Sequence, residues 1–210
     1  MIYIKSFTFS PFQENTYVIY NDHSECMIVD PGCYDSREEK MLSDFIESHH
    51  LKPVLLMNTH CHIDHVFGNK YVSEKYNLTP LIHPIEEAML AAVPRVADMY
   101  GVNYTPSPAP NFISGETIHL GDEVFDILFV PGHSPGHIAL YHAATDSLIV
   151  GDVLFHQSIG RTDLPGGDME TLLKSIRTKI FTLPDNTKVY PGHMETTTVG
   201  YEKQYNPFLN

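Results

Sequence analysis

The sequence contains few basic residues and no run of them. Lys and Arg number 13 against 26 Asp and Glu, and the formal net charge is −13. An acidic surface repels a phosphate backbone, so we expect no nucleic acid partner. The longest apolar runs are too short to cross a bilayer, and residues 1–10 lack the basic and apolar regions of a signal peptide. We therefore expect no membrane association and no export.

Cysteine is also scarce. Cys26, Cys33 and Cys61 are odd in number and form no Cys-x-x-Cys pair. We expect no structural disulfide and a reducing, cytoplasmic setting. Low-complexity segments are absent, and a hydrophobic content of 42% in 210 residues suffices for one well-buried domain. The prediction is a single domain over residues 1–210 that acts on a small molecule, with the oligomeric state left open.

Short apolar runs separated by turn residues predict an α/β protein. Strands are predicted over residues 2–9, 16–20, 26–29, 54–57, 80–82, 117–120, 124–130, 138–141, 147–150 and 188–190. Helices are predicted from a capping box at Ser36 to about His50, over 69–76 and 85–92, and after a cap at Asp168. The proline-rich segment 93–115 is predicted to be a long ordered loop, either a partial lid or a connector.

Histidine is unusually frequent, since the 13 His residues are as many as Lys and Arg together. The segment after the buried strand 54–57 holds His60, His62, Asp64 and His65, all potential metal ligands. Imidazole and carboxylate suit zinc and similar divalent ions. His60 and His62 alternate, so both face one way in an extended turn, while Asp64 and His65 reach a second position. Two ligand pairs side by side predict two metals.

Three further candidates follow the same positional logic. His133, Asp152 and His193 each come directly after a predicted strand and next to a glycine that allows close backbone approach. Rigid scaffolds present functional groups on such strand-end loops. Seven ligands on four strand ends make two sites if one carboxylate bridges the metals.

The His-x-His-x-Asp-His motif, followed by a lone His, an Asp and a last His, resembles the metallo-β-lactamase-fold hydrolase superfamily. Asp30-Pro31-Gly32 also matches the early turn of that family. The resemblance implies a four-layer αββα sandwich with two mixed sheets flanked by helices. It implies two divalent ions, with zinc expected and iron or manganese as alternatives. The implied ligands are His60, His62 and His133 for the first metal, Asp64, His65 and His193 for the second, and Asp152 as the bridge.

The segment Ser158–Asp168 resembles the glyoxalase II-like branch, which includes short hydroxyacylglutathione hydrolase homologues and persulfide dioxygenases. The leading hypothesis is hydrolysis of a thioester or ester by attack of a metal-bound hydroxide. Asp64 is the candidate catalytic residue, because a ligand with a second oxygen can orient the hydroxide and take its proton. Gly-x-Ser-x-Gly is absent, which argues against a serine nucleophile. Arg161 is predicted either to bind the anionic end of a substrate or to form a structural salt bridge.

Two alternatives stay open at this point. A persulfide dioxygenase would hold a single iron with His60, His133 and Asp152. A non-catalytic metal-binding scaffold would bind metal without turning over an activated thioester. His137 either orients a neighbouring ligand or simply packs, and Cys61 is interpreted as a small buried side chain that points away from the metals.

Overall fold

The computed structural model describes residues 1–209, which form two compact units. Unit 1 comprises Met1–Ser114 and His119–Glu123, and unit 2 comprises Gly115–Ile118 and the residues from Val124 onward. Each unit is built on mixed strands with helices against them, as predicted for the fold class. The sequence predicts a single domain over residues 1–210, and the division into two compact units leaves this a prediction.

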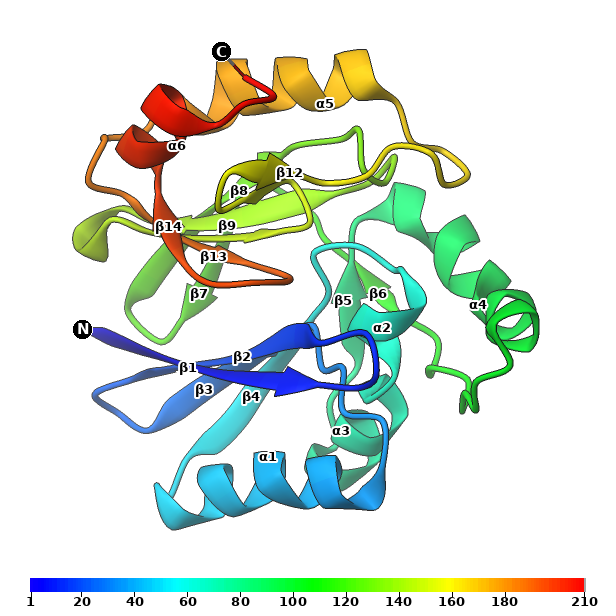
Figure 1. Ribbon diagram of the computed structural model, residues 1–210. Coiled ribbons are helices and arrows are strands. Elements are labelled where there is room, and N and C mark those ends of the chain that lie inside the picture. Colours follow the sequence, from blue (N-terminus) through cyan, green and yellow to red (C-terminus); the bar gives the residue numbers. More distant parts are fainter. Residues whose placement is uncertain (210) are drawn as a thin grey trace. The chain divides into compact units, whose positions relative to one another are not determined.

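The sheet of unit 1 has six strands in the order β1-β2-β3-β4-β5-β6 (Figure 1). Their bounds are β1 Ile2–Phe9, β2 Glu14–Asn21, β3 Glu25–Val29, β4 Lys52–Met57, β5 Pro80–Ile82 and β6 Asn111–Phe112. The first three strands pair antiparallel, and β3 to β6 pair parallel. The carboxyl ends of β3, β4 and β5 therefore meet at one edge of this sheet, together with the start of β2.

Helices α1 (Ser36–Ser48) and α3 (Asn69–Tyr76) lie on the same side of this sheet (Figure 1). Their apolar residues Leu42, Ile46 and Val72 join a buried cluster with residues of β2, β3 and β4. The predicted capping box at Ser36 is wrong by one residue. The N-cap is Asp35, whose carboxylate accepts hydrogen bonds from the first-turn N–H groups of Arg37 and Glu38 at 2.9 Å each.

The predicted loop over 93–115 is partly helical. Helix α4 (Glu87–Tyr100) follows the one-turn helix η1 (Pro84–Glu86) and contains Pro94 in its interior. An interior proline costs about 3 kcal/mol of helix stability. Burial of Leu90, Val93 and Ala97 in one apolar cluster opposes that cost, because these residues share one helix face. The helix ends at Gly101, which adopts the left-handed conformation with φ +66°.

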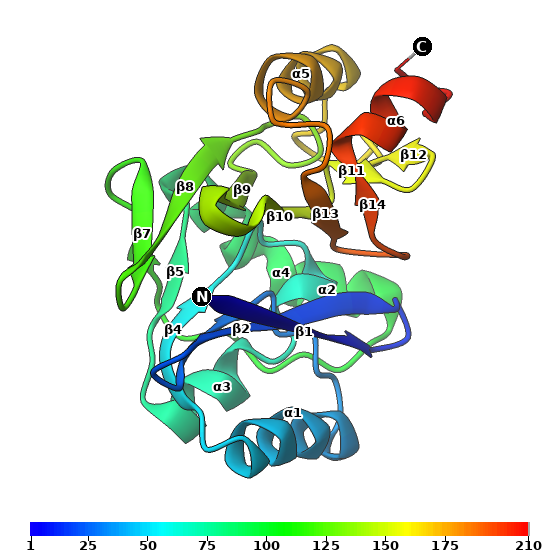
Figure 2. The same ribbon diagram turned by 90° about the vertical axis from the view of Figure 1, so that its left-hand side faces the viewer.

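The second sheet has the order β14-β13-β10-β9-β8-β7 (Figure 2). Its strands are β7 Thr117–Leu120, β8 Glu123–Phe129, β9 Ile138–His142, β10 Ser147–Gly151, β13 Lys188–Pro191 and β14 Thr197–Thr198. Strand β9 is antiparallel to both β8 and β10, and β10 is parallel to β13. Strands β8, β10 and β13 therefore run in the same direction and end at the same edge.

Three helical segments cover one face of the second sheet. They are α5 (Met169–Ser175), the π-helical turn η3 (Ile176–Ile180) and α6 (Val199–Tyr205). Figure 2 shows α5 and α6 on the same side of the sheet, and Leu172, Ile176 and Val199 join its buried core. The predicted cap at Asp168 is confirmed, since its carboxylate accepts the N–H of Thr171 at 2.7 Å.

Several short elements were not predicted. They include the hairpin β11–β12 (Leu154–Phe155 and Ser158–Ile159), the turn η2 (Ala143–Thr145), β6, β14 and α6. Two-residue strands leave too short a hydrophobic pattern to detect from the sequence. No helix within residues 1–209 is both long enough and apolar enough to span a membrane.

Candidate metal centre

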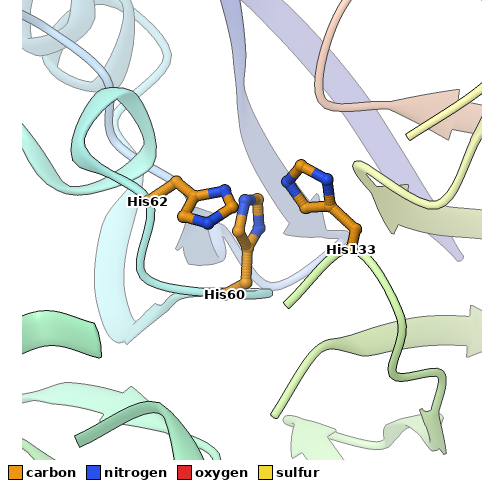
Figure 3. Close-up of side chains that lie close together, drawn as sticks. All are labelled: His60, His62 and His133. Atoms are coloured by element: carbon orange, nitrogen blue, oxygen red, sulfur yellow. The ribbon is translucent and has the colours of Figure 1, made fainter. Parts of the chain in front are cut away.

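Four of the predicted ligands lie together in unit 1. His60 and His62 occupy the turn after β4, and the short helix α2 (Ile63–Val66) carries Asp64 and His65. The ring centroid of His60 lies 4.7 Å from that of His62 and 4.1 Å from that of His65. His65 Nε2 is 3.8 Å from Asp64 Oδ2. Figure 3 shows His60 and His62 projecting from this segment.

Asp30 orients this group and was not predicted as a site residue. It follows β3, and its Oδ1 accepts the N–H of Thr59 at 2.7 Å. Its Oδ2 accepts the Thr59 hydroxyl at 2.6 Å and lies 3.1 Å from His65 Nδ1. A carboxylate on Nδ1 favours the Nδ1–H tautomer, which presents the Nε2 lone pair to a metal. The signal in the sequence was the Asp-Pro-Gly turn at the end of the strand beside β4.

Glu14 is a fully buried carboxyl beside the same histidine. Its Oε1 lies 4.0 Å from His65 Nδ1, and its Oε2 accepts the hydroxyl of Thr16 at 2.9 Å. Burial raises the pKa of Glu14 well above its usual range, and the neighbouring His65 opposes this shift. A Cβ on Gly32 would collide with this carboxyl group and lie 2.7 Å from the Asp64 carbonyl oxygen. The turn after β3 therefore requires glycine at this position.

The other three predicted ligands lie together in unit 2. His133 follows β8, Asp152 follows β10 and His193 follows β13. Asp152 Oδ2 is 3.5 Å from His133 Nε2 and also 3.5 Å from His193 Nε2. Because the three strands end at one edge, ligands far apart in the sequence meet at one carboxylate oxygen.

Neighbouring groups fix the orientation of these residues. His133 Nδ1 lies 2.8 Å from the main-chain carbonyl of Arg161, which again leaves Nε2 as the nitrogen able to ligate a metal. His137 is buried, and its Nε2 accepts the N–H of Asp152 at 3.1 Å. A Cβ on Gly160 would collide with the Asp152 carbonyl oxygen and lie 3.2 Å from His133 Cβ. His137 thus contacts the main chain of a predicted ligand, and its role in orienting that ligand stays a prediction.

The distances fit metal ligation better than direct hydrogen bonding. Two ligands of a tetrahedral zinc, each bonded at about 2.1 Å, lie roughly 3.4 Å apart. The two separations of 3.5 Å from Asp152 Oδ2 match that value and exceed an ordinary hydrogen bond. Imidazole nitrogens and carboxylate oxygens are also the donors that zinc and iron accept. These residues therefore fit a divalent metal.

Arg161 has a partner within its own segment. Its Nε and Nη2 each donate to one carboxylate oxygen of Asp163 at 2.7 Å. The guanidinium lowers the pKa of Asp163 to about 2. The structure thus shows a salt bridge, and both side chains are largely exposed to solvent. Substrate binding by Arg161 stays a prediction.

The three cysteines are buried free thiols. Cys61 joins the apolar cluster of Leu90 and Val93. Burial raises the pKa of the Cys61 thiol well above its usual range, and the negative charges of Glu86 and Asp30 add to the shift. A thiol held in this form is a poor nucleophile and a poor metal ligand.

The model of the metallo-beta-lactamase superfamily matches residues 9–193. The chain belongs to this superfamily. It is 39% identical over 203 residues to the Bacillus subtilis protein named "Probable metallo-hydrolase YqgX", with 95% of this chain and 94% of the relative covered. It is 36% identical over 203 residues to "Hydroxyacylglutathione hydrolase GloC" of Haemophilus influenzae, with the same coverage.

Solved structures agree with this assignment. The crystal structure titled BLEG-1 B3 metallo-beta-lactamase superposes with a TM-score of 0.91 at 36% identity and covers all of both chains. The structure titled TTHA1623 in a di-iron-bound form gives 0.88 at 33% identity, with 98% of this chain and all of the other covered. The predicted metallo-β-lactamase fold, with mixed sheets and flanking helices, is confirmed.

Proposed function

We propose that this metal-dependent hydrolase of the metallo-beta-lactamase superfamily cleaves a thioester or ester of the hydroxyacylglutathione type. The relative named GloC, which aligns over most of both chains, supports this substrate class. The segment 158–168, which resembles the glyoxalase II-like branch, also supports it. That segment contributes the Arg161 carbonyl that orients His133.

The proposed centre holds two divalent ions. The proposed ligands are His60, His62 and His133 for the first ion, Asp64, His65 and His193 for the second, and Asp152 for both. One observation carries this proposal. Asp152 Oδ2 is equally distant, at 3.5 Å, from one proposed ligand of each ion, as a bridging oxygen should be.

A bound divalent ion supplies a water of lowered pKa and polarises a carbonyl group. The chain supplies orientation and a proton acceptor. Asp64 Oδ2 lies 3.8 Å from His65 Nε2, and both residues would hold the proposed second ion. We propose that the other carboxylate oxygen orients a water and accepts its proton. The departing thiolate needs little help from an acid, since thiols have pKa values of about 8.5.

Zinc is the proposed metal, and iron is the main competitor. The ligand set of five histidines and two aspartates suits either ion. The neighbouring structure titled as a di-iron form shows that a closely related fold binds iron. Metal analysis of the purified protein separates the two.

Hydrolysis of a β-lactam is the second candidate reaction. The specific observation in its favour is the 36% identity to a structure titled as a B3 metallo-beta-lactamase. Thioester hydrolysis ranks first because two observations support it, namely the GloC relative at the same 36% identity and the glyoxalase II-like segment 158–168.

The deciding experiment combines metal analysis with three assays on one sample. We expect two metal ions per chain, turnover of S-lactoylglutathione, and little activity on a β-lactam or on glutathione persulfide. One iron per chain with oxygen uptake on the persulfide would establish the dioxygenase alternative. Metal binding without turnover of any of the three substrates would favour the scaffold.

We also propose that the protein acts in the cytoplasm on a small molecule, without nucleic acid or membrane partners. The three buried free thiols suit a reducing compartment. The net charge of −13 disfavours contact with phosphate backbones. Equal activity in the cytoplasmic and membrane fractions of the source cells would contradict this proposal.

A further inference from the structure

Glu86 is a fully buried carboxylate that no step of the proposed reaction uses. It ends η1, the turn that follows β5. Its Oε2 accepts the main-chain N–H of Cys61 at 2.8 Å. Cys61 stands between His60 and His62, so this hydrogen bond holds the backbone between two proposed ligands of the same ion.

The position of Glu86 mirrors that of Asp30. Strand β4 leads into the segment His60–His65, called here the ligand segment. It is flanked by β3 on one side and β5 on the other, and both neighbours run parallel to it. Asp30 follows β3 and accepts the N–H of Thr59, whereas Glu86, beyond β5, accepts the N–H of Cys61. Two buried carboxylates from opposite sides of β4 thus hold the main chain on both sides of His60.

We propose that Glu86 is a positioning residue that sets the geometry of His60 and His62 for the first metal ion. This inference rests on the metal centre of the proposed function. A hydrogen bond to a charged acceptor is stronger and shorter than one between neutral groups. Without it, the buried N–H of Cys61 loses its partner, and the turn must shift to regain one. Both imidazoles would then move with the backbone.

Glu38 offers a matched control in the same unit. It is also a buried glutamate whose carboxylate accepts main-chain N–H groups, those of Ser10 and Tyr34, at 3.0 and 2.8 Å. These groups lie outside the ligand segment. Glu38→Met should therefore reproduce the general cost of losing a buried carboxylate without affecting metal affinity.

The experiment compares Glu86→Met, Glu86→Gln and Glu38→Met by zinc affinity and thermal unfolding. Zinc affinity is measured by competition with a chromophoric chelator. Glu86→Met should lower it about 10- to 100-fold, the range typical for residues that orient metal ligands. Glu86→Gln keeps an acceptor oxygen at the same reach and should recover most of the affinity, with a smaller loss than Glu86→Met because a neutral acceptor bonds less strongly. Under saturating zinc, Glu86→Met should lower kcat more than it changes KM.

Equal zinc affinity in Glu86→Met and Glu38→Met would overturn the inference. If Glu86→Met does not fold, Glu86→Asp replaces it, since this variant keeps the charge but shortens the reach. Wild-type zinc affinity in Glu86→Asp would overturn the inference equally. Because zinc affinity is measured without turnover, a wild-type protein that binds zinc but cleaves no thioester contradicts the proposed reaction alone.

Discussion

The two units provide their proposed ligands in different ways. Unit 1 supplies four from one short segment, His60 to His65, where spacing along the chain already places them together. Unit 2 supplies three from three loops, and only the parallel course of β8, β10 and β13 brings them to one edge. The first set depends on local conformation, and the second depends on strand pairing.

The groups that orient the ligands differ as well. Unit 1 uses buried carboxylates, with Asp30 and Glu86 both accepting main-chain N–H groups. Unit 2 uses an imidazole and a carbonyl, with His137 accepting the N–H of Asp152 and the Arg161 carbonyl contacting His133. Substitutions in the two units should therefore have different consequences.

The largest effect is expected for Asp152→Ala. This substitution removes the one oxygen shared by the two proposed metal positions, whereas each residue in unit 1 is assigned to a single position. Zinc affinity should fall by more than about 100-fold, because even residues that only orient ligands cost 10- to 100-fold. Metal analysis after dialysis should find both ions depleted. Retention of one full equivalent of zinc would show that Asp152 does not bridge.

Asp64→Ala tests the catalytic residue of unit 1. The expected loss in kcat is about 10²- to 10⁴-fold, the usual contribution of general acid–base catalysis. The circular dichroism spectrum should stay unchanged, because the Asp64 side chain, although buried, does not belong to the apolar cluster that Ile63 and Val66 join. A loss below tenfold at full metal loading would remove Asp64 from the mechanism.

Asp30→Asn and His137→Gln compare the orienting groups of the two units. The asparagine amide presents one oxygen where Asp30 uses two, so zinc affinity should fall about 10-fold or more. Glutamine keeps an acceptor near the position of His137 Nε2, so His137→Gln should retain most of the affinity. Calorimetric titration of zinc into the apo variants gives both values. A larger loss in His137→Gln than in Asp30→Asn would reverse the proposed contrast.

The smallest effect concerns Arg161 at the exposed rim of unit 2. If this residue binds substrate, Arg161→Ala should raise KM for anionic thioesters more than for neutral ones and leave kcat little changed. Asp163→Asn should lower KM for anionic thioesters, because it removes the carboxylate that holds the guanidinium and so releases Arg161 to bind substrate. Equal responses of charged and neutral substrates would mean that Arg161 only supports its loop.

The same ion pair makes a prediction about pH. The pKa of Asp163 is lowered to about 2 in the folded protein, so the stabilisation of its charged form is complete above the ordinary aspartate pKa. It is lost progressively as the pH falls below that value and through about 2. A carboxyl resonance of Asp163 followed by NMR should titrate with a midpoint near that value. A midpoint near 4 would show that the pair does not persist in solution.

Helix α4 and the cap of α1 show the limits of local patterns. The prolines of segment 93–115, Pro94 first among them, predicted that the helix ends before residue 93. The helix instead continues to Tyr100, because Leu90, Val93 and Ala97 are buried on one of its faces. Ser36 and Glu39 matched a capping box, yet Asp35 is the cap that the backbone selects. In both cases several conformations suit the local sequence, and packing or backbone geometry chooses among them.

The sequence by itself determined the fold class, most strands and the candidate ligands, because hydrophobic periodicity and ligand chemistry are local properties. It also placed His60, His62, Asp64 and His65 together, since they are close neighbours in the chain. Only the tertiary structure decided which distant groups contact the predicted ligands and their neighbours. Asp30, Glu86 and His137 act through main-chain N–H groups, and their partners depend on which strands pair and in which direction. Strand pairing is a long-range property, because it reflects the packing of whole sheets and leaves no mark on the residues nearby in sequence.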